Sequence, residues 1–432
     1  MHRTVAVIGL GKIGLPLAAQ FASQGWSVIG CDVLPDVVEA VNAGRSHVHQ
    51  EAGLEDAVAQ AVATGSLSAT LDTAGAVKSS SVVVLIVPLL TDSQHNIDFR
   101  NLELAARDVG RGLGQGTLVI CETTVPVGTT RNRLAPILEE ASGLRAGVDF
   151  FVAFSPERLY SGRIFADLRR YPKIVGGLEP EGTQRAVDFY KSVLDADVRA
   201  VKNAETAEFA KLAETTYRDV NIALANELAL YGAARDVDVA EAFTAANSQP
   251  FSHLHRPSIG VGGHCIPVYP HFLLADATDG ELELPRAGRA VNDHMVDVAI
   301  TSLEKVLGTL RDRRILVLGA SYREDVKELA FSTAIPLVQR LREKGADVDL
   351  YDPLYRPEEL QSLGANVIDV GSNSHLDADA VVVQALHTSM RDLDWSRLRG
   401  VKAVFDGRGA LDRSVTDRLG AVYLAVDVPV PK

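Results

Sequence analysis

A short apolar segment, a glycine-rich turn and a helix-like segment at the start of the chain constrain its fold most. Residues 4–9, TVAVIG, are rich in apolar side chains with strand propensity and run directly into the turn GLGKIG. Residues 15–25 have helical character and end at a glycine, and residues 26–32 form a second apolar segment that ends in an acid. This order of strand, turn, helix, strand and acid is typical of a doubly wound α/β domain.

The glycines of this turn, Gly9, Gly11 and Gly14, have the G-x-G-x-x-G spacing of a dinucleotide-binding turn. The first permits the tight turn, the second lets the backbone approach a pyrophosphate, and the third lets helix and strand pack closely. The N–H groups at the helix N-terminus attract the anion. Asp32 would accept hydrogen bonds from a ribose hydroxyl and repel a 2′-phosphate, so the turn predicts NAD rather than NADP.

Further apolar segments follow at the spacing of alternating strands and helices, at residues 81–87, 117–122, 150–154 and 173–177. Such segments suit a parallel sheet that is buried on both faces, and ligands bind at the carboxyl ends of its strands. Polar residues in those places point to the pocket, although each could instead cap a turn: Thr123, Thr124, Glu157 and Arg158. We expect the cofactor to contact Gly9, Gly11, Lys12, Ile13, Gly14, Asp32, Pro88 and Thr124.

The composition excludes several classes of protein. A net charge of −13 argues against a surface for nucleic acid or anionic membrane. Three widely spaced cysteines favour neither a disulfide framework nor a zinc cluster, and we expect no metal. The chain shows neither a signal peptide nor an apolar run of membrane-spanning length, so we expect a cytoplasmic protein.

The pattern changes near residue 203. Residues 203–237 have apolar side chains at helical spacing, which predicts a long helix, broken once and deeply buried. Asn221 and Asn226 stand in an apolar setting that a solvated helix face explains poorly, whereas Lys211 alone is compatible with a surface lysine. Residues 286–307 predict another helix, which closes an all-helical central domain.

Between these helices lies the segment GVGGHCIPVYP, residues 260–270, here named the cysteine loop. Its glycines let the backbone come close to a ligand, and Pro267 restricts the chain just after Cys265. The segment therefore presents a thiol on a shaped loop. From these residues alone, a small buried side chain in a glycine-rich turn is an equally good interpretation of Cys265.

A new α/β pattern starts at RRILVLGASY, residues 313–322. Apolar segments follow at strand spacing, but LGASY replaces the glycine fingerprint, so this unit would bind a nucleotide differently or be structural. The predicted fold is α/β, with two Rossmann-like doubly wound domains joined by an all-helical central domain that contains a long helix. We place the domains at residues 1–202, 203–310 and 311–432.

Together these features resemble the UDP-glucose/GDP-mannose dehydrogenase family over nearly the whole chain. The resemblance is carried by GLGKIG, TTVPVGT, SPERLYSG, KLAETTYRDVNIALANE, GVGGHCIPV, LGASYREDV and FDGRG. The variants YRDVNIA and GVGGHC are most similar to the branch that oxidises UDP-N-acetylhexosamines, such as the UDP-linked N-acetylmannosamine and N-acetylglucosamine sugars. The resemblance favours Cys265 as a nucleophile.

This resemblance implies a four-electron oxidation of a sugar C6 hydroxyl to a carboxylate, with two NAD molecules and a cysteine thiohemiacetal and thioester. Lys211 would stabilise the oxyanion and depress the thiol pKa, and Thr124 and Glu157 would hold or activate water. The implied catalytic residues are Cys265, Lys211, Glu157, Thr124 and Thr215. The implied substrate-binding residues are Glu157, Arg158, Lys211, Arg218, Asn221, Arg256, Gly262, His264, Arg323 and Arg408. Arg408 would grip phosphate in a bidentate fork, whereas Arg256 is equally compatible with an ordinary loop arginine.

The chain departs from the family pattern at several positions. Thr215 stands where an Asn is usual, and Tyr269 where an Asp is usual, four residues after the cysteine. Arg323 replaces a lysine, and AFS (residues 330–332) replaces RES. These departures concern the roles of individual residues and leave the implied reaction unchanged.

The implied substrate is UDP-N-acetylmannosamine or UDP-N-acetylglucosamine, and three alternatives remain at this point. They are a UDP-glucose 6-dehydrogenase, a two-electron β-hydroxyacid-type dehydrogenase, and a catalytically silent nucleotide-sugar-binding homologue. Residues 313–432 and Cys265 argue against the second. The resemblance also implies a homodimer through the central helical domain and a uronic acid product for a surface polysaccharide.

Overall fold

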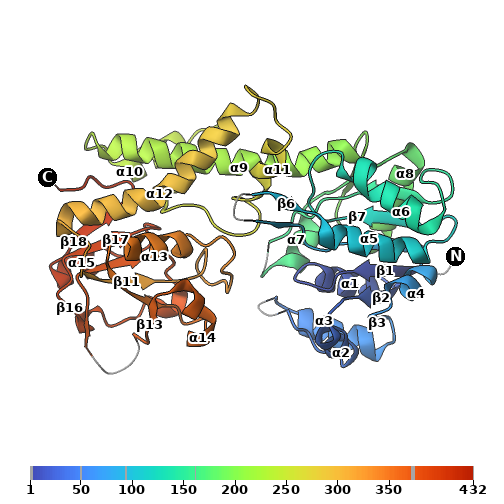
Figure 1. The fold of residues 1–432 in the computed structure, drawn as a ribbon, viewed down its shortest axis with the longest axis horizontal. Coiled ribbons are helices and arrows are strands. Elements are labelled where there is room, and N and C mark those ends of the chain that lie inside the picture. Colours follow the sequence, from blue (N-terminus) through green and yellow to red (C-terminus); the bar gives the residue numbers. More distant parts are fainter. Residues whose placement is uncertain (1–2, 49–50, 93–94, 161, 371–374, 432) are drawn as a thin grey trace. The chain divides into compact units, whose positions relative to one another are not determined.

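The structure, a computed structural model, describes residues 3–48, 51–92, 95–160, 162–370 and 375–431. The chain forms two compact units, Met1–Glu214 and Thr215–Lys432. The boundary falls inside helix α9, Ala204–Ala233 (Figure 1). Parallel sheets in both units and the long helix confirm the predicted fold class. The division into three domains stays a prediction.

A sheet of eight strands, counted within the described residues, forms the centre of the first unit. The strand order is β10-β9-β8-β7-β4-β1-β2-β3, and the neighbours from β3 to β8 are parallel. The order from β3 to β8 is that of a dinucleotide-binding sheet, with its reversal between β1 and β4. The strands are β1 (Thr4–Ile8), β2 (Ser27–Cys31), β3 (Leu67–Thr70), β4 (Val82–Leu85), β7 (Leu118–Cys121), β8 (Phe151–Phe154), β9 (Lys173–Gly177) and β10 (Val198–Ala200).

Helices cover both faces of this sheet because successive side chains of a strand point to opposite faces. Val5 and Val7 of β1 belong to one buried cluster, and Ala6 and Ile8 belong to another. The helical elements are α1 (Gly14–Ser23), α2 (Pro35–Asn42), α3 (Leu54–Ala63), α4 (Thr73–Lys78), α5 (Arg100–Gly112), a π-helical turn (Thr130–Leu134), α6 (Ala135–Ser142), α7 (Ile164–Arg170) and α8 (Pro180–Val193). Two short strands, β5 (Leu90–Thr91) and β6 (Ile97–Asp98), form a hairpin.

The direction of β9 corrects the prediction of a fully parallel sheet. β9 is antiparallel to β8, with Ala153 opposite Gly177 and Phe154 opposite Gly176. The segment after β8 stays at the carboxyl edge of the sheet, and the chain re-enters from that edge instead of crossing to the other one. As a result Lys173, the first residue of β9, lies beyond the carboxyl end of β8.

The second unit repeats the doubly wound arrangement. Its main sheet has the order β13-β12-β11-β15-β17-β18 with all neighbours parallel, and the order reverses between β11 and β15. This confirms the predicted second Rossmann-like unit. The strands are β11 (Arg314–Leu318), β12 (Asp347–Tyr351), β13 (Asn366–Val367), β15 (Ala380–Val383), β17 (Ala403–Asp406) and β18 (Val422–Ala425), with a small separate pair β14 (Leu376–Asp377) and β16 (Leu398–Arg399).

The helices of the second unit flank this sheet, and α12 packs against β17 and β18. Besides most of α9 they are α10 (Val239–Ala246), α11 (Tyr269–Leu274), α12 (Glu283–Leu307), α13 (Ala334–Glu343), α14 (Pro357–Leu360) and α15 (Ser414–Leu419), with 3₁₀ turns at Gln361–Leu363, Thr388–Met390 and Trp395–Arg397. No helix in the described part of the chain combines the length and the apolar composition that crossing a bilayer requires.

Helix α9 differs from its prediction in two ways. It is one unbroken helix of 30 residues, because it contains no proline and its glycine, Gly232, lies in the last turn. It is also not deeply buried on all sides. Tyr217, Leu224, Leu228 and Tyr231 are 59%, 43%, 39% and 60% exposed, and they follow one another at helical spacing.

Candidate active site

The glycine-rich turn after β1 has the geometry of a pyrophosphate cradle. Gly9 has a φ of +98°, and a Cβ there would lie 2.8 Å from the carbonyl oxygen of Ile86. A Cβ on Gly14 would lie 1.8 Å from the carbonyl oxygen of Gly9. A Cβ on Gly11, in contrast, would meet no protein atom within 4 Å. Two of the glycines therefore close the turn, and the third leaves open space where a pyrophosphate would approach.

The remaining predicted cofactor residues surround this turn. Asp32 follows β2 and accepts hydrogen bonds from the N–H groups of Leu10 (2.9 Å) and Leu34 (3.0 Å), which orients its carboxylate beside the turn. Ile13 directly precedes α1, and Lys12 lies in the turn itself. These residues fit NAD, with the helix N-terminus toward the pyrophosphate and Asp32 toward a ribose.

The carboxyl ends of β4 and β7 meet beside this cradle. Pro88 is exposed after β4, and the hydroxyl of Thr123 donates to the carbonyl of Val87 at 2.7 Å. Thr123 and Thr124 are buried. Thr123 thus ties the two strand ends together, and Thr124 lies on the same edge of the sheet.

A buried cluster that the sequence did not predict lies at the same edge. We name Glu122, Glu157, Lys173 and Tyr190 the Lys173 cluster. The Lys173 ammonium donates to Glu122 at 3.0 Å and also forms an ion pair with Glu157. The Tyr190 hydroxyl donates to the other oxygen of Glu122. Burial lowers the pKa of Lys173, and burial raises the pKa of Tyr190 well above its usual value.

Two predicted active-site residues of the first unit lie against this cluster. Lys211 of α9 donates from its ammonium to the main-chain oxygen of Glu157 at 2.5 Å. Arg158 donates to Glu214 at 2.7 Å and to the carbonyl of Pro172. The structure therefore brings Glu157 and Lys211 together, and Arg158 is paired with the carboxylate of Glu214.

Glu208, also missed by the sequence analysis, fixes the segment that follows Thr124. Its fully buried carboxylate accepts hydrogen bonds from the N–H groups of Gly128 (2.6 Å) and Thr130 (2.9 Å) and from the Thr130 hydroxyl. It thereby satisfies donors at the start of the π-helical turn and joins that turn to α9. Burial outweighs these bonds and raises the pKa of Glu208 to about 6.

This raised pKa predicts a pH-dependent stability. Between pH 4.5 and about 6 the folded chain holds a proton on Glu208 that the unfolded chain has lost. The free energy of unfolding therefore falls by about 2 kcal/mol as the pH rises through this window. Denaturant unfolding of the wild type and of Glu208→Gln at pH 4.5 and 6.5 measures it, since the variant lacks this contribution. Equal pH slopes in the two proteins would contradict the assignment.

Cys265 differs from the other two cysteines in its exposure. Cys31 and Cys121 are buried, and burial raises the pKa of the Cys31 thiol to about 12 and also raises that of Cys121. Cys265 is exposed, just before α11, and its carbonyl accepts the N–H of Tyr269 at 3.0 Å. Only the thiol of Cys265 is therefore placed to react.

The glycines of the cysteine loop are explained by the segment that packs on them. A Cβ on Gly262 would lie 2.7 Å from the Cβ of Tyr322, and a Cβ on Gly263 would lie 3.1 Å from the Tyr322 ring. Gly263 also donates its N–H to the carbonyl of Ala330. His264 is 60% exposed, with its Nε2 3.8 Å from the Glu328 carboxylate. Residues 320–332 thus form the surface on which the cysteine loop packs, and we name this segment the bed.

Arg408 holds this bed and the cysteine loop together. Its guanidinium donates to the carbonyls of Gln384 (2.8 Å), Gly260 (3.3 Å) and Tyr322 (2.7 Å) and to the side-chain oxygen of Gln384. These bonds use four of its five N–H donors. The predicted bidentate grip on a phosphate would have to compete with them. Arg323, by contrast, donates to the Tyr322 hydroxyl at 3.0 Å.

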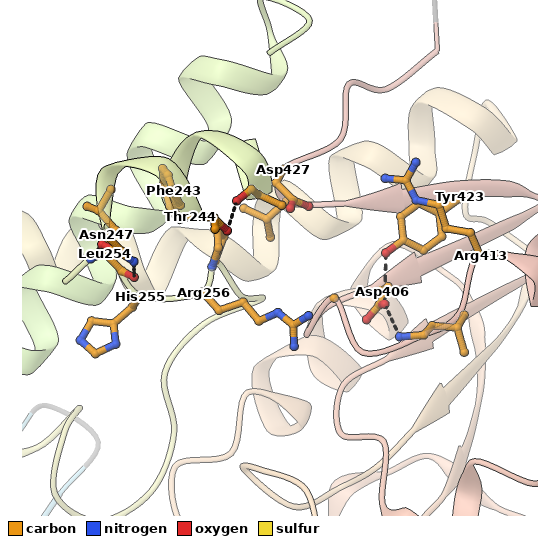
Figure 2. A pocket seen from close by; sticks show the side chains of 15 residues that line it. Phe243, Thr244, Asn247, Leu254, His255, Arg256, Asp406, Arg413, Tyr423 and Asp427 are labelled. Carbon is orange, nitrogen blue, oxygen red and sulfur yellow. Dashed lines mark hydrogen bonds between the residues drawn. The ribbon is translucent and has the colours of Figure 1, made fainter. Parts of the chain in front are cut away.

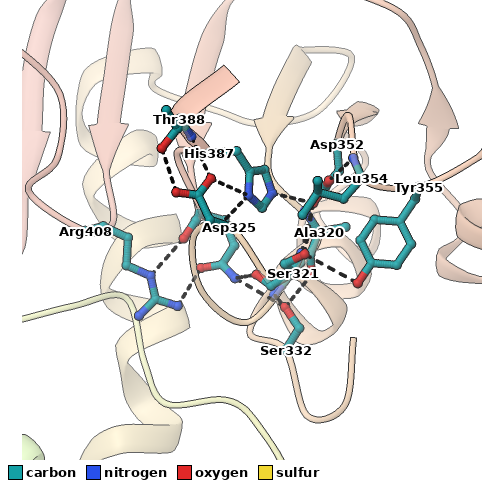
Figure 3. Close-up of polar contacts among 12 residues, drawn as sticks. Ala320, Ser321, Asp325, Ser332, Asp352, Leu354, Tyr355, His387, Thr388 and Arg408 are labelled. Atoms are coloured by element: carbon teal, nitrogen blue, oxygen red, sulfur yellow. Dashed lines mark hydrogen bonds and ion pairs between the residues drawn. The ribbon is translucent and has the colours of Figure 1, made fainter. Parts of the chain in front are cut away.

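The switch point of the second sheet is filled by side chains (Figure 3). Asp352 accepts the N–H groups of Ala320 and Ser321 and pairs with Nε2 of the buried His387 at 3.0 Å. Nδ1 of His387 accepts the N–H of Asp325 at 2.8 Å, so Nε2 is the nitrogen that carries the proton. Asp352 occupies the place after β12 that Asp32 has after β2, but it is 4% exposed and its partners are internal. Asp352 therefore has a structural role in the second unit.

A polar network joins the segment just before the cysteine loop to α9. Asn226, fully buried, accepts the N–H of Ser258 at 2.8 Å and donates to Asn292 of α12 at 3.1 Å. Asn292 in turn donates to Asp219, which pairs with Arg289 at 2.6 Å. This explains the amide of Asn226 that the apolar pattern left unexplained. Asn221 instead bonds its own helix, donating to the carbonyl of Tyr217 at 2.7 Å.

A pocket of about 460 Å³ opens beside these elements. It lies between α10, residues 254–257 and the ends of β17 and β18, and it contains Arg256 and Arg413 (Figure 2). Figure 2 shows the Arg256 side chain extending toward the wall formed by Asp406 and Tyr423. Burial, and then the charge of Arg218, lower the pKa of His255, which also lines the pocket, so Arg218 lies close to His255. The pocket combines cationic groups with an aromatic ring.

The sequence matches one known protein family in three consecutive parts of the chain. Residues 3–194 match the NAD binding domain of the UDP-glucose/GDP-mannose dehydrogenase family, residues 205–294 its central domain, and residues 316–413 its UDP binding domain. The chain belongs to this family. As a UDP-glucose/GDP-mannose dehydrogenase family member it is an NAD-dependent nucleotide-sugar oxidoreductase, which confirms the predicted enzyme class and the predicted cofactor.

Relatives within this family share nearly the full length of the chain. A UDP-N-acetyl-D-mannosamine dehydrogenase of Pyrococcus horikoshii is 36% identical over 421 residues, which cover 94% of this chain and 96% of the relative. A UDP-N-acetyl-D-glucosamine 6-dehydrogenase of Pseudomonas aeruginosa is 30% identical and covers 96% and 98%. A solved structure of UDP-D-ManNAc dehydrogenase from Pyrococcus horikoshii superposes with a TM-score of 0.87 at 35% identity, covering 98% of this chain and 100% of that one.

The departures from the family pattern occupy defined places in this family member. Thr215 is buried at the start of the second unit's part of α9. Tyr269 begins α11, and its ring lies 5.3 Å from that of Phe272. In the AFS segment, Ser332 matches the serine of RES, is buried and donates to the carbonyl of Ala320, while Phe331 contacts His264. These residues support the bed of the cysteine loop.

Proposed function

We propose that this enzyme oxidises the C6 hydroxyl of a UDP-N-acetylhexosamine, UDP-N-acetylmannosamine or UDP-N-acetylglucosamine, to the carboxylate with two NAD molecules. The observation that carries the proposal is the exposure of Cys265 on a glycine-shaped loop, in a chain whose other thiols are buried. A two-electron alcohol dehydrogenase needs no such thiol. The relatives that act on UDP-N-acetylhexosamines support this choice of sugar.

The chain's own residues then divide the chemistry. NAD, when bound at the turn of Gly9, Gly11 and Gly14, accepts the two electrons of each oxidation. The Cys265 thiolate adds to the C6 aldehyde, and the second oxidation leaves a thioester. The Lys211 ammonium stabilises the negative charge on the C6 oxygen. Water then attacks the thioester carbon, the C–S bond breaks, and Glu157 takes the proton of the water.

The second unit would hold the nucleotide. Its match to the UDP binding domain and the pocket that contains Arg256 both support this assignment. Arg256 lines this pocket and Arg323 donates to the Tyr322 hydroxyl, and both would supply charge for the diphosphate, whereas Arg408 is engaged with the carbonyls of Gln384 and Tyr322. Arg408 acts mainly by holding the cysteine loop on its bed. Gly262 and His264 would contact the sugar from the cysteine loop.

The exposed face of α9 supports a homodimer. Tyr217, Leu224, Leu228 and Tyr231 form an apolar stripe, and Arg235 stacks on the ring of Tyr231 at 3.5 Å. Stripes of this kind on a long helix are covered when two copies pair about a twofold axis. We also propose the three domains 1–202, 203–310 and 311–432, which the extents of the family matches support.

A panel of nucleotide sugars tests the proposed substrate. The enzyme is mixed with NAD and either UDP-N-acetylmannosamine, UDP-N-acetylglucosamine or UDP-glucose, and NADH formation is followed by absorbance. One of the two N-acetyl sugars is expected to give the highest kcat/KM, with NADP inactive because of Asp32. A preference for UDP-glucose would move the enzyme to another branch of the family. Binding of all three without NADH would favour a silent nucleotide-sugar-binding protein.

A further inference from the structure

Lys173 is a buried cation between two carboxylates. Its side chain is 6% exposed, and those of Glu122 and Glu157 are 0% and 10% exposed. The Lys173 ammonium lies 3.0 Å from Glu122 and 4.8 Å from the ring centre of Tyr190, and it is paired with Glu157. Buried lysines are rare unless they are paired, because burial opposes their charge. Packing alone therefore does not explain why Lys173 is buried between two carboxylates.

The antiparallel strand β9 explains how Lys173 comes to this place. Continuing the register of β8 and β9 beyond Phe154 puts Lys173 opposite Glu157. The carboxyl end of β7 adds Glu122, and α8 adds the Tyr190 hydroxyl. The antiparallel pairing thus places the Lys173 ammonium beside Glu157. Glu157 is the residue to which we assign the final proton transfer.

Lys173 controls the charge of this site because it stands between two negative groups. With Lys173 in place, the two carboxylates and the ammonium carry a net charge of −1. Without it, Glu122 and Glu157 would repel each other, and one of them would take up a proton. Lys211 also approaches this site and donates its ammonium to the main-chain oxygen of Glu157 at 2.5 Å.

We infer that Lys173 is a positioning residue that keeps the Glu157 carboxylate ionised and oriented for accepting a proton during thioester hydrolysis. The inference rests on the proposed function. In that step a water O–H bond breaks, a bond forms between the water oxygen and the thioester carbon, the C–S bond breaks to release the Cys265 thiolate, and the proton goes to Glu157. No oxidant is needed. A protonated Glu157 cannot accept this proton, so hydrolysis would slow.

The charged groups around Glu157 determine in which direction its titration shifts when Lys173 is removed. The negative charge of Glu122 opposes ionisation of Glu157, whereas the positive charges of Lys173 and Lys211 favour it. Removing Lys173 therefore shifts the titration of Glu157 to higher pH. The titratable groups that face Glu157 and its partners are Glu122 and Cys121 at the end of β7, Lys173 on β9, Tyr190 on α8 and Lys211 on α9.

Two variants of the complete enzyme test the role, with one control. Lys173→Met removes the cation, and Lys173→Arg keeps it. Lys191→Met removes an exposed lysine of α8 and serves as the matched control. If Lys173→Met does not fold, the double variant Glu122→Gln/Lys173→Met removes one of the two unpaired carboxylates and takes its place. Acyl-enzyme on Cys265 is measured by intact mass during turnover, together with the pH profile of carboxylate release.

The expected results distinguish a positioning role of Lys173 from a purely structural one. Lys173→Met should accumulate acyl-enzyme, and its rate of carboxylate release at pH 7 should fall roughly 10–100-fold. The acidic limb of its pH profile for carboxylate release should shift to higher pH by about one unit. KM for the sugar should change little, and Lys173→Arg should restore the wild-type limb. An unchanged pH profile without acyl-enzyme in the folded Lys173→Met or double variant would overturn the inference. A wild type that forms neither NADH nor acyl-enzyme would instead overturn the proposed function on which it rests.

Discussion

Replacing Cys265 by serine is expected to stop carboxylate formation. A serine hydroxyl is a much weaker nucleophile than a thiolate at neutral pH, and an ester would hydrolyse more slowly than a thioester. The rate of carboxylate release should fall by roughly 10³-fold or more. Chromatography with mass detection measures the product directly. Carboxylate release by Cys265→Ser at the wild-type rate would contradict the role of this thiol.

Thiol labelling supplies the control for this variant. Cys31 and Cys121 are buried and Cys265 is exposed, so the native enzyme should react quickly with one equivalent of a thiol reagent. Native Cys265→Ser should show no fast labelling, while all remaining thiols should react after unfolding. Fast labelling of two or three thiols in the native wild type would show that burial does not separate the cysteines as described.

Replacing Gly14 by alanine is expected to disrupt the cofactor domain. The added Cβ would lie 1.8 Å from the carbonyl oxygen of Gly9, which is main chain and cannot rotate away. Helix α1 would have to move away from the turn, at a cost of about 3 kcal/mol in the free energy of unfolding. Denaturant unfolding and NAD binding should both be impaired. Wild-type stability in Gly14→Ala would contradict this packing.

Gly11 provides a matched comparison in the same turn. A Cβ there meets no protein atom within 4 Å, so Gly11→Ala should keep its stability. The methyl group would occupy the space into which the pyrophosphate fits, and Kd for NAD should rise tenfold or more, about 1.4 kcal/mol. Unchanged NAD affinity in Gly11→Ala would mean that the pyrophosphate does not approach the turn at this glycine.

The strand and turn patterns of the sequence predicted much of this architecture. The near-continuous apolar strands, the glycine spacing and Asp32 led to a doubly wound first unit, and the strand order bears this out. The second α/β unit was predicted from strand spacing without a glycine fingerprint. Both predictions succeeded because buried parallel strands leave a strong local signal.

The Lys173 cluster could not be predicted because it depends on the direction of one strand. In a fully parallel sheet, Lys173 as the first residue of its strand would lie at the amino edge, away from the site. The antiparallel pairing of β9 with β8 reverses this. Glu122, in contrast, directly follows an apolar strand, and the rule that predicted Thr123 and Thr124 could have found it.

Arg408 and α9 show the limits of single-residue reasoning. The resemblance assigned Arg408 to a phosphate, but the residue lies where three carbonyl groups of different segments converge, and such convergence has no local sequence signal. The apolar residues of α9 were assigned to the core, although Tyr217 and Tyr231 are exposed. Helical periodicity alone does not tell a core face from a face that awaits another chain.

The ratio of NADH formed to sugar consumed decides whether the enzyme carries out a four-electron oxidation through Cys265. With limiting UDP-N-acetylmannosamine or UDP-N-acetylglucosamine and excess NAD, we expect two NADH per sugar and one uronic acid product. One NADH per sugar, with an aldehyde or ketone as the final product and no acyl-enzyme on Cys265, would contradict it.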